Sequence, residues 1–113
     1  MNFIGDLAGN YHTLLALLSK MPDEETWSVG DMIDRGPRSK ECLEHFMKHG
    51  KALLGNHEHL MLNHMRKGTF YDEGLWFENG GRRTTWSFGG DSHEPNIPEE
   101  ILAWLESLPL FYE

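Results

Sequence analysis

The sequence has few of the features that mark secreted, membrane-spanning or nucleic-acid-binding proteins. Its single cysteine, Cys42, cannot form an internal disulfide, and its apolar helical surroundings favour a core thiol in a reducing compartment. No apolar run approaches the roughly 20 residues that a membrane-spanning helix needs, and the first residues lack a signal-peptide pattern. We therefore expect a cytoplasmic protein without a membrane partner.

The charge pattern argues against a second class of partner. The formal net charge is −8, and no segment carries a dense group of lysine and arginine residues. Nucleic acids and anionic membranes bind basic surfaces, so we expect neither as a partner. An acidic protein is better suited to binding metal cations.

The length and composition indicate one small domain spanning residues 1–113. With 113 residues and 39% hydrophobic content, the chain can bury one core but not two. Its 12 glycines and 5 prolines suit a loop-rich α/β domain and are too few for a disordered or collagen-like chain. The sequence also contains no internal repeat.

Apolar periodicity predicts strands and helices that alternate along the chain. Short buried strands are expected at residues 2–5, 26–29 and 52–54. Helices are expected after Asn10, Pro37 and Gly55, the first with a broad apolar stripe from Leu14 to Met21. This βαβαβ order implies an α/β fold with a parallel sheet.

The rest of the chain is expected to add C-terminal helices. Two short helices covering the sheet are expected between residues 68 and 90, and a last helix runs from Pro98 to Pro109. The aromatic residues of this part are expected in the core: Trp76, Phe77, Trp86 and Trp104. Residues 110–112 begin a further strand that is shorter than the usual five or six residues, so the chain is interpreted as the front half of a longer domain.

Residues with metal-binding or catalytic chemistry follow all three expected strands. Asp6, Asp31 and Asn56 come directly after them, and Arg35 and His57 lie close by. One such turn alone would be an ordinary surface loop, since Asp and Gly are common turn residues. Because the carboxyl ends of parallel strands meet at one sheet edge, three such turns predict a shared site.

The residue types at these strand ends point to phosphoryl chemistry. Carboxylate and amide oxygens with one imidazole suit Mn, Fe, Zn or Mg. If Asp31 bridges two ions, they would hold a phosphoryl group and activate a water for in-line attack. His57 would protonate the leaving oxygen, with Asp34 or Glu58 holding its ring, and Arg35 would bind phosphate oxygens.

Three motifs carry a resemblance to a known family. They are Gly5-Asp6-x-x-Gly9, Gly30-Asp31-x-x-Asp34-Arg35-Gly36 and Gly55-Asn56-His57-Glu58. They resemble the signature motifs of the calcineurin-like metallophosphoesterases, in the phosphoprotein phosphatase branch. A further segment, Trp76-x-x-Asn79-Gly80-Gly81-x-x-Thr84, is similar to bacterial and bacteriophage protein phosphatases and to the symmetrical diadenosine tetraphosphate hydrolases.

This resemblance implies a fold and a role for each motif residue. The chain would be the N-terminal half of a metallophosphoesterase sandwich, truncated before its C-terminal half. Asp6, Asp31 and Asn56 would bind two divalent metal ions, with Asp31 bridging them and Mn²⁺ as the expected metal. The catalytic residues would be His57 as general acid, Asp34 as the carboxylate that orients it, and Arg35 on the phosphate.

The chain departs from the family pattern at the metal ligands. Ala8 stands where the first motif of the family has a histidine, and the two later histidine ligands of the family have no counterpart. A methyl group cannot coordinate a metal ion. The resemblance therefore implies an incomplete metal site and weak or absent activity in this chain.

Three functions stay open at this point. The first is a metal-dependent protein serine/threonine phosphatase that acts on a phosphoprotein or another phosphate ester. The second is a dinucleoside polyphosphate hydrolase, and the third is an inactive fragment or pseudoenzyme that acts as a binding module. Half of a sandwich leaves one sheet face and one edge uncovered, so self-association through them is also expected.

Overall fold

The fold is built on a three-stranded parallel sheet, seen here in a computed structural model that describes residues 1–91 and 93–111. The strands are β1 (Asn2–Ile4), β2 (Thr26–Ser28) and β3 (Lys51–Ala52), in the spatial order β1-β2-β3. Phe3 pairs with Trp27, and Trp27 with Lys51. The predicted parallel α/β arrangement is confirmed, although each strand is shorter than the sequence pattern indicated.

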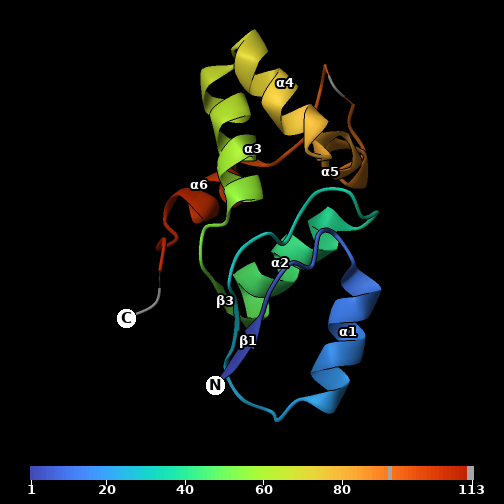
Figure 1. Ribbon diagram of the computed structural model, residues 1–113, viewed down its shortest axis with the longest axis vertical. Helices are drawn as coiled ribbons and strands as arrows, with labels where there is room; N and C mark the ends of the chain where they lie inside the picture. The colour runs from blue at the N-terminus through green and yellow to red at the C-terminus, as the bar shows by residue number, and fades with distance from the viewer. Residues whose placement is uncertain (92, 112–113) are drawn as a thin grey trace.

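Two crossover helices connect the strands and pack against each other. They are α1 (Tyr11–Lys20) and α2 (Ser39–His49), as Figure 1 shows. Residues of β1 and β2 alternate in burial: Ile4 and Ser28 are buried, whereas Phe3 is 48% exposed. The side of the sheet that carries Ile4 therefore faces the core, and the opposite side is open.

The C-terminal helices extend the molecule beyond the carboxyl ends of the strands. They are α3 (Asn56–Lys67), α4 (Phe70–Glu78), α5 (Gly81–Ser87) and α6 (Glu99–Glu106). Helix α4 packs on α3, α5 packs on α2 and α4, and α6 packs on α2 and α3. The expectation that two short helices cover the sheet is therefore wrong, because α4 and α5 lie against other helices at the upper end of Figure 1.

The core lies between the sheet, α2 and the C-terminal helices. Its fully buried large side chains include Leu14, Met32, Ile33, Phe46, Met61, Trp76 and Leu105. Met32 and Ile33 are loop residues, and their burial anchors the loop that follows β2. Cys42 is also buried, and burial raises the pKa of its thiol to about 12, which agrees with a packing role.

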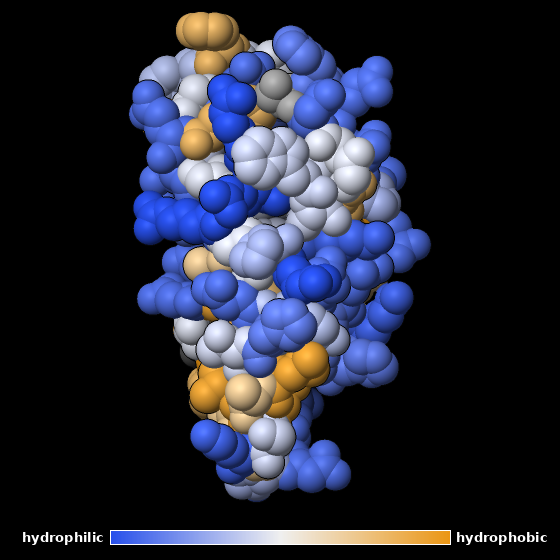
Figure 2. Space-filling view, turned by 90° about the vertical axis from the view of Figure 1, so that its right-hand side faces the viewer, coloured by the Kyte–Doolittle hydropathy of each residue, from blue (hydrophilic) through white to orange (hydrophobic). Residues whose placement is uncertain are grey.

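Several residues expected in the core are exposed. Leu15 and Leu17 of α1 are 44% and 39% exposed, and Figure 2 shows an apolar patch over this helix. Trp86 is 57% exposed and Trp104 is only partly buried, so Trp76 is the one fully buried tryptophan of the described residues.

The described end of the chain does not continue as a strand. Leu110 and Phe111 lie in a bend, and residue 112 of the expected strand is outside the described residues. The backbone N–H of Leu54 nevertheless donates to the carbonyl of Pro109 over 2.8 Å, which places this segment beside the end of β3. In the part of the chain that the structure describes, no helix has the length and apolar character to cross a membrane.

Candidate functional site

The loops that follow the three strands meet at one hollow of about 430 Å³. Asp6, Ala8, Asp31, Arg35 and His57 line it. They come from three separate strand ends, as expected for the carboxyl edge of a parallel sheet. Asn56 is the exposed first residue of α3, beside His57, but it is not among the residues that line the hollow.

The backbone of the first two loops adopts conformations that are uncommon for residues with side chains. Among the described residues, six non-glycine residues have positive φ, and five of them are here: Asp6, Ala8, Asp31, Asp34 and Arg35. Such conformations cost of order 1–3 kcal/mol each and concentrate at functional sites. Their clustering around one hollow marks this edge of the sheet as the candidate site.

Contacts between neighbouring loops hold this strained backbone in place. The N–H of Ala8 donates to the carbonyl of Asp31 over 3.0 Å, and the N–H of Gly9 donates to Met32 over 2.8 Å. Gly30 has a φ of 102°, and a Cβ atom there would lie 2.5 Å from the Cα of Gly55. Only glycine allows the loops after β2 and β3 to approach so closely.

Glu58 fixes the loop that carries Asp31. Its carboxylate is fully buried and accepts backbone N–H groups from Asp31 at 2.7 Å, Met32 at 2.9 Å and Gly55 at 3.0 Å. Burial raises the pKa of Glu58 to about 7, while the hydrogen bonds from these three donors counteract the shift. This carboxylate is thus committed to the backbone and does not hold the His57 ring.

The scaffolding role of Glu58 was missed from the sequence, where it was an alternative partner for His57. A signal for it exists, because Gly55 is the N-cap of α3 and Glu58 is the third residue of the helix. A glutamate at that position reaches back to the backbone at the start of the helix in a capping box. Here the same side chain also reaches the neighbouring loop.

His57 is held by a different carboxylate, that of Asp34. His57 Nδ1 lies 2.8 Å from Asp34 Oδ2, and the Asp34 side chain is completely buried. Trp76 Nε1 donates to both Asp34 oxygens over 3.1 Å, and Thr84 Oγ1 donates to Oδ1 over 2.5 Å. Burial raises the pKa of Asp34, and the hydrogen bonds from Thr84 and His57 oppose that shift.

Trp76 and Thr84 are therefore part of the candidate site, although the role expected for Trp76 from the sequence was packing in the core. Both lie more than 40 residues after Asp34 in the chain, and helices α4 and α5 bring them to it. The motif that contains them gave a signal for the family but none for this contact.

Arg35 is the cationic side chain of the hollow. The backbone N–H of Arg35 donates to the carbonyl of Gly80 over 3.2 Å, and a Cβ atom at Gly80 would lie only 2.6 Å from Arg35 Cγ. The glycine thus lets the loop between α4 and α5 pack directly against Arg35. Arg82 and Arg83 lie instead over the rings of Phe77 and Trp86, at 5.1 and 5.7 Å from their centroids.

The hollow offers few donor atoms for metal ions. Asp6 and Asp31 offer carboxylates, Asn56 offers an amide oxygen, and Ala8 offers nothing, while His57 Nδ1 is already engaged by Asp34. Among the described residues, no group of three or more His, Cys, Asp and Glu side chains is arranged to hold a metal ion. These residues therefore do not by themselves complete a site for two ions.

The other histidines give no substitute ligand at this hollow. Those that do not line it are His12, His45, His49, His59, His64 and His93. His12, the nearest to Ala8 in the sequence, is an exposed residue of α1.

Comparisons with known proteins identify the relatives of this chain. The family model of the calcineurin-like phosphoesterases matches residues 2–110. A symmetrical bis(5'-nucleosyl)-tetraphosphatase of Methylobacillus flagellatus is 44% identical over 62 residues, covering 49% of this chain and 22% of the relative. One of the same name from Shewanella sp. is 41% identical over 70 residues, covering 55% and 26%.

A solved structure gives the same result at the level of the fold. The metallophosphoesterase from Sphaerobacter thermophilus has a TM-score of 0.62 and 25% identity, with 95% of this chain and 39% of that chain covered. The matched region is thus about a quarter of the curated relatives' length and about two fifths of the Sphaerobacter thermophilus chain.

Proposed function

The chain belongs to the calcineurin-like phosphoesterase family, and on this premise we propose that its hollow is part of a hydrolase site for phosphate esters or anhydrides. One observation carries the proposal: the His57 ring, bound through Nδ1 to the buried Asp34, lines the same hollow as Asp6, Asp31 and Arg35. A proton donor, a phosphate-binding cation and hard oxygen donors share one space there.

The proton-transfer step follows from the Asp34–His57 geometry. Asp34 accepts from Nδ1–H of the imidazolium, which leaves Nε2–H for the oxygen of the leaving group. The bond from phosphorus to that oxygen breaks as the proton moves to it, and water supplies the new oxygen on phosphorus. The proton released by the attacking water restores His57. Asp34 stabilises the charged ring throughout, because its own position is fixed by Trp76 and Thr84.

Arg35 is proposed to bind the non-bridging phosphate oxygens through its planar guanidinium. Asp6 and Asp31 in the same hollow would repel a phosphate, so a cation is needed beside them. Members of the family use divalent metal ions. We propose Asp6, Asp31 and Asn56 as this chain's donors, with Mn²⁺ as the metal and Fe, Zn or Mg as alternatives.

Because Ala8 adds no donor, this chain is proposed to bind metal weakly and to turn over slowly by itself. An inactive polypeptide that acts as a binding module remains the alternative. The same test decides between them, since a site that is only short of a ligand gains activity when the ligand is restored.

The proposed substrate class is a dinucleoside polyphosphate. The sequence pointed first to phosphoproteins, with dinucleoside polyphosphates as an alternative, but the curated relatives carry the name symmetrical bis(5'-nucleosyl)-tetraphosphatase, which supports this alternative. A cytoplasmic location remains part of the proposal.

The test is the rate of hydrolysis of diadenosine tetraphosphate and of a phosphoserine peptide with Mn²⁺ present. We expect Ala8→His to raise the rate above that of the natural chain, with diadenosine tetraphosphate preferred. Adding His57→Ala to Ala8→His should lower the rate by about 10²–10⁴-fold, the usual contribution of general acid catalysis. His59→Ala, at an exposed histidine of the same helix, is the matched control and should leave the rate unchanged.

Two outcomes would contradict the proposal. Equal hydrolysis rates after adding His57→Ala or His59→Ala to the Ala8→His chain would show that His57 takes no part in the reaction. A folded Ala8→His chain without turnover would favour the binding module.

A further inference from the structure

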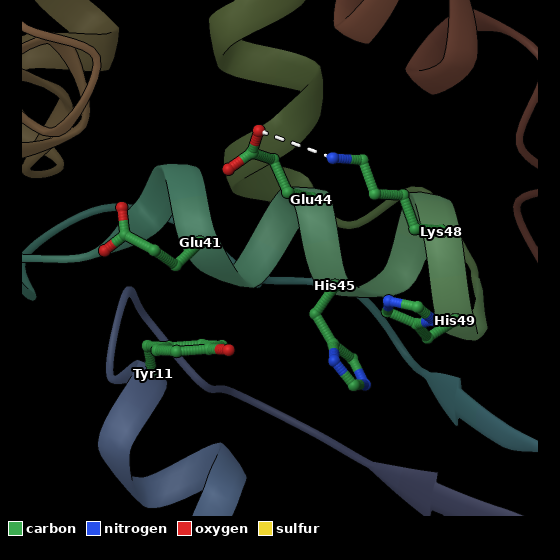
Figure 3. Close-up of a pocket in the computed structure, with 6 residues that line it drawn as sticks. All are labelled: Tyr11, Glu41, Glu44, His45, Lys48 and His49. Atoms are coloured by element: carbon green, nitrogen blue, oxygen red, sulfur yellow. Dashed lines mark ion pairs between the residues drawn. The ribbon is translucent and has the colours of Figure 1, made fainter.

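Two histidines that the proposed reaction does not use lie one turn apart on α2. His45 and His49 are at positions i and i+4 of this helix, so their side chains project from the same face. Figure 3 shows His45 on the side of α2 that faces Tyr11 of α1, with the His49 ring beside it. Glu44 and Lys48 form an ion pair over 4.0 Å and line the same hollow as the two histidines.

The separation of the two rings matches what one metal ion requires. Their centroids are 5.7 Å apart, with an angle of 50° between the planes. A zinc ion bonded to one nitrogen of each ring at about 2.0–2.1 Å would place the centroids about 5 to 6 Å apart. The two imidazoles can therefore share an ion with side-chain rotation alone, because the helix already fixes their backbone spacing.

The surroundings hold the His45 ring and add negative charge. Phe46 packs edge-on against His45, with ring centroids 5.2 Å apart, and His45 is partly buried. Both histidines line two hollows, one of about 150 Å³ with Tyr11 and Glu41, and one of about 360 Å³ with Asp23 and Glu24. Lys48 also lines the first hollow and pairs with Glu44, so the negative charge that favours a cation near the rings comes mainly from Asp23 and Glu24 in the second hollow.

The lowered pKa of His45 suits this residue to a role as a metal ligand. Burial lowers its pKa, and the charge of His49 lowers it further. A neutral ring keeps a lone pair for a metal, whereas a protonated ring has none to give. At neutral pH this histidine is thus prepared for coordination.

We propose that His45 and His49 form a two-histidine binding site for a transition-metal ion of the Zn²⁺, Ni²⁺ or Cu²⁺ type. Imidazole ligands suit these ions, whereas Mn²⁺ and Mg²⁺ prefer carboxylate and carbonyl oxygens. The described residues hold no group of three or more His, Cys, Asp and Glu side chains placed around one ion, so water fills the remaining coordination positions. The site is separate from the hollow that contains Asp31, whose lining includes neither histidine.

This site has a practical consequence for any metal titration of the protein. Zn²⁺ added to test the Asp6 and Asp31 hollow would also bind on α2. Binding measured with Zn²⁺ or Ni²⁺ would then be assigned to the wrong part of the molecule unless the two sites are separated by substitution.

The proposal is tested by calorimetric titration of the whole chain with Zn²⁺. His45→Gln and His49→Gln should each abolish the α2 site, and circular dichroism would verify that the variants stay folded. His49 is exposed, so its replacement leaves the core intact. His59→Gln, at an exposed histidine on α3, should bind Zn²⁺ as the natural chain does.

Asp31→Asn separates this inference from the proposed function. It removes a donor from the hollow and should leave Zn²⁺ binding at α2 unchanged. Loss of Zn²⁺ binding in Asp31→Asn, with binding retained in His45→Gln, would assign the ion to the hollow and overturn the α2 site.

Electron paramagnetic resonance of Cu²⁺ adds a direct reading of the ligands. The natural chain should show coupling to two imidazole nitrogens, and His49→Gln should reduce this to one. A spectrum without nitrogen coupling in the natural chain, or the same two-nitrogen spectrum in a double His45→Gln, His49→Gln variant, would overturn the proposal.

Discussion

The two sides of the hollow differ in how completely the protein itself satisfies their polar groups. On one side, Asp34 receives hydrogen bonds from Trp76 and Thr84 and holds His57, and its side chain is fully buried. On the other side, Asp6 and Asp31 face the hollow next to the methyl group of Ala8. Packing and hydrogen bonds can complete a proton donor, but a metal site needs a full count of donor atoms.

Glu58 connects the two sides. Glu58 belongs to the helix that also carries His57, and by accepting the N–H groups of Asp31 and Met32 it positions the loop that carries Asp31. The side of the hollow with Asp6 and Asp31 is therefore held in its shape although it has too few donor atoms for two metal ions. This comparison leads to four predictions, given from the largest expected effect to the smallest.

Trp76→Ala should give the largest loss of stability, because the side of the hollow that contains Asp34 depends on this ring. Trp76 is fully buried, packs against His64 and Phe77, and bonds to Asp34. Removing a buried tryptophan costs about 3–5 kcal/mol, against a total stability of about 5–15 kcal/mol. Urea unfolding followed by circular dichroism measures the change.

The matched control is Trp86→Ala. This tryptophan is 57% exposed, so its loss should change the free energy of unfolding by no more than about 0.5 kcal/mol. Trp104 was expected in the core with Trp76, but it is only partly buried. Equal losses of unfolding free energy from Trp76→Ala and Trp86→Ala would contradict the proposed importance of the side of the hollow that contains Asp34.

Trp76→Phe sharpens the comparison, because it keeps an aromatic ring in the core but removes the N–H donor to Asp34 together with part of the buried ring volume. A hydrogen bond to a charged group contributes about 1.5–3 kcal/mol, so a loss of this size in unfolding free energy is expected. Turnover in the Ala8→His background should fall as well, since Asp34 orients His57. Trp104→Phe is the control, and an equal loss there would show that the indole N–H of Trp76 has no special role.

Ala8→His should add a metal ligand to the side of the hollow that contains Asp6 and Asp31. The backbone at Ala8 has a φ of 48°, a region that histidine tolerates better than most residues. We expect Mn²⁺ affinity to rise by about tenfold, which corresponds to about 1.4 kcal/mol, in calorimetric titration. Ala8→Phe adds similar bulk without a donor and should give no increase; a gain in both variants would disprove coordination by the new histidine.

The smallest effect is expected at the open face of the sheet, where we propose weak self-association. Phe3 and Val29 are 48% and 47% exposed, and a parallel sheet normally has both faces covered. Val29→Lys should lower the apparent mass in light scattering at high protein concentration. Leu15→Lys on the apolar patch of α1 is the comparison (Figure 2), and dispersal by this variant alone would move the contact from the sheet to α1.

The sequence predicted the order of the sheet and the meeting of its loops for reasons that are local. Each short apolar segment before Asp6, Asp31 and Asn56 can only be a buried strand, and helices between them force the strands to run parallel. The capping glycine at Gly50 and the proline at Pro98 also mark helix boundaries that the structure has within one residue.

Exposure and long-range contacts could not be predicted in this way. Leu15 and Leu17 fit a helical stripe as well as Leu14 does, but of the three only Leu14 is buried, because α1 packs against α2 along one narrow face. Residue chemistry alone likewise left Asp34 and Glu58 open as partners for His57, and it was the resemblance to the family that favoured Asp34. Only their positions in space separate a carboxylate that meets the ring from one that meets three backbone N–H groups.

What the sequence by itself determined is the chemistry available at the strand ends: two carboxylates, an amide, an imidazole, a guanidinium, and a methyl group at Ala8. These are properties of side chains, and no packing changes them. What only the tertiary structure decided is how those groups are divided. Helices α4 and α5 bring Trp76 and Thr84 to Asp34 across more than 40 residues, and this non-local packing holds the carboxylate that contacts His57, whereas the described residues place no group of three or more His, Cys, Asp and Glu side chains around one metal ion.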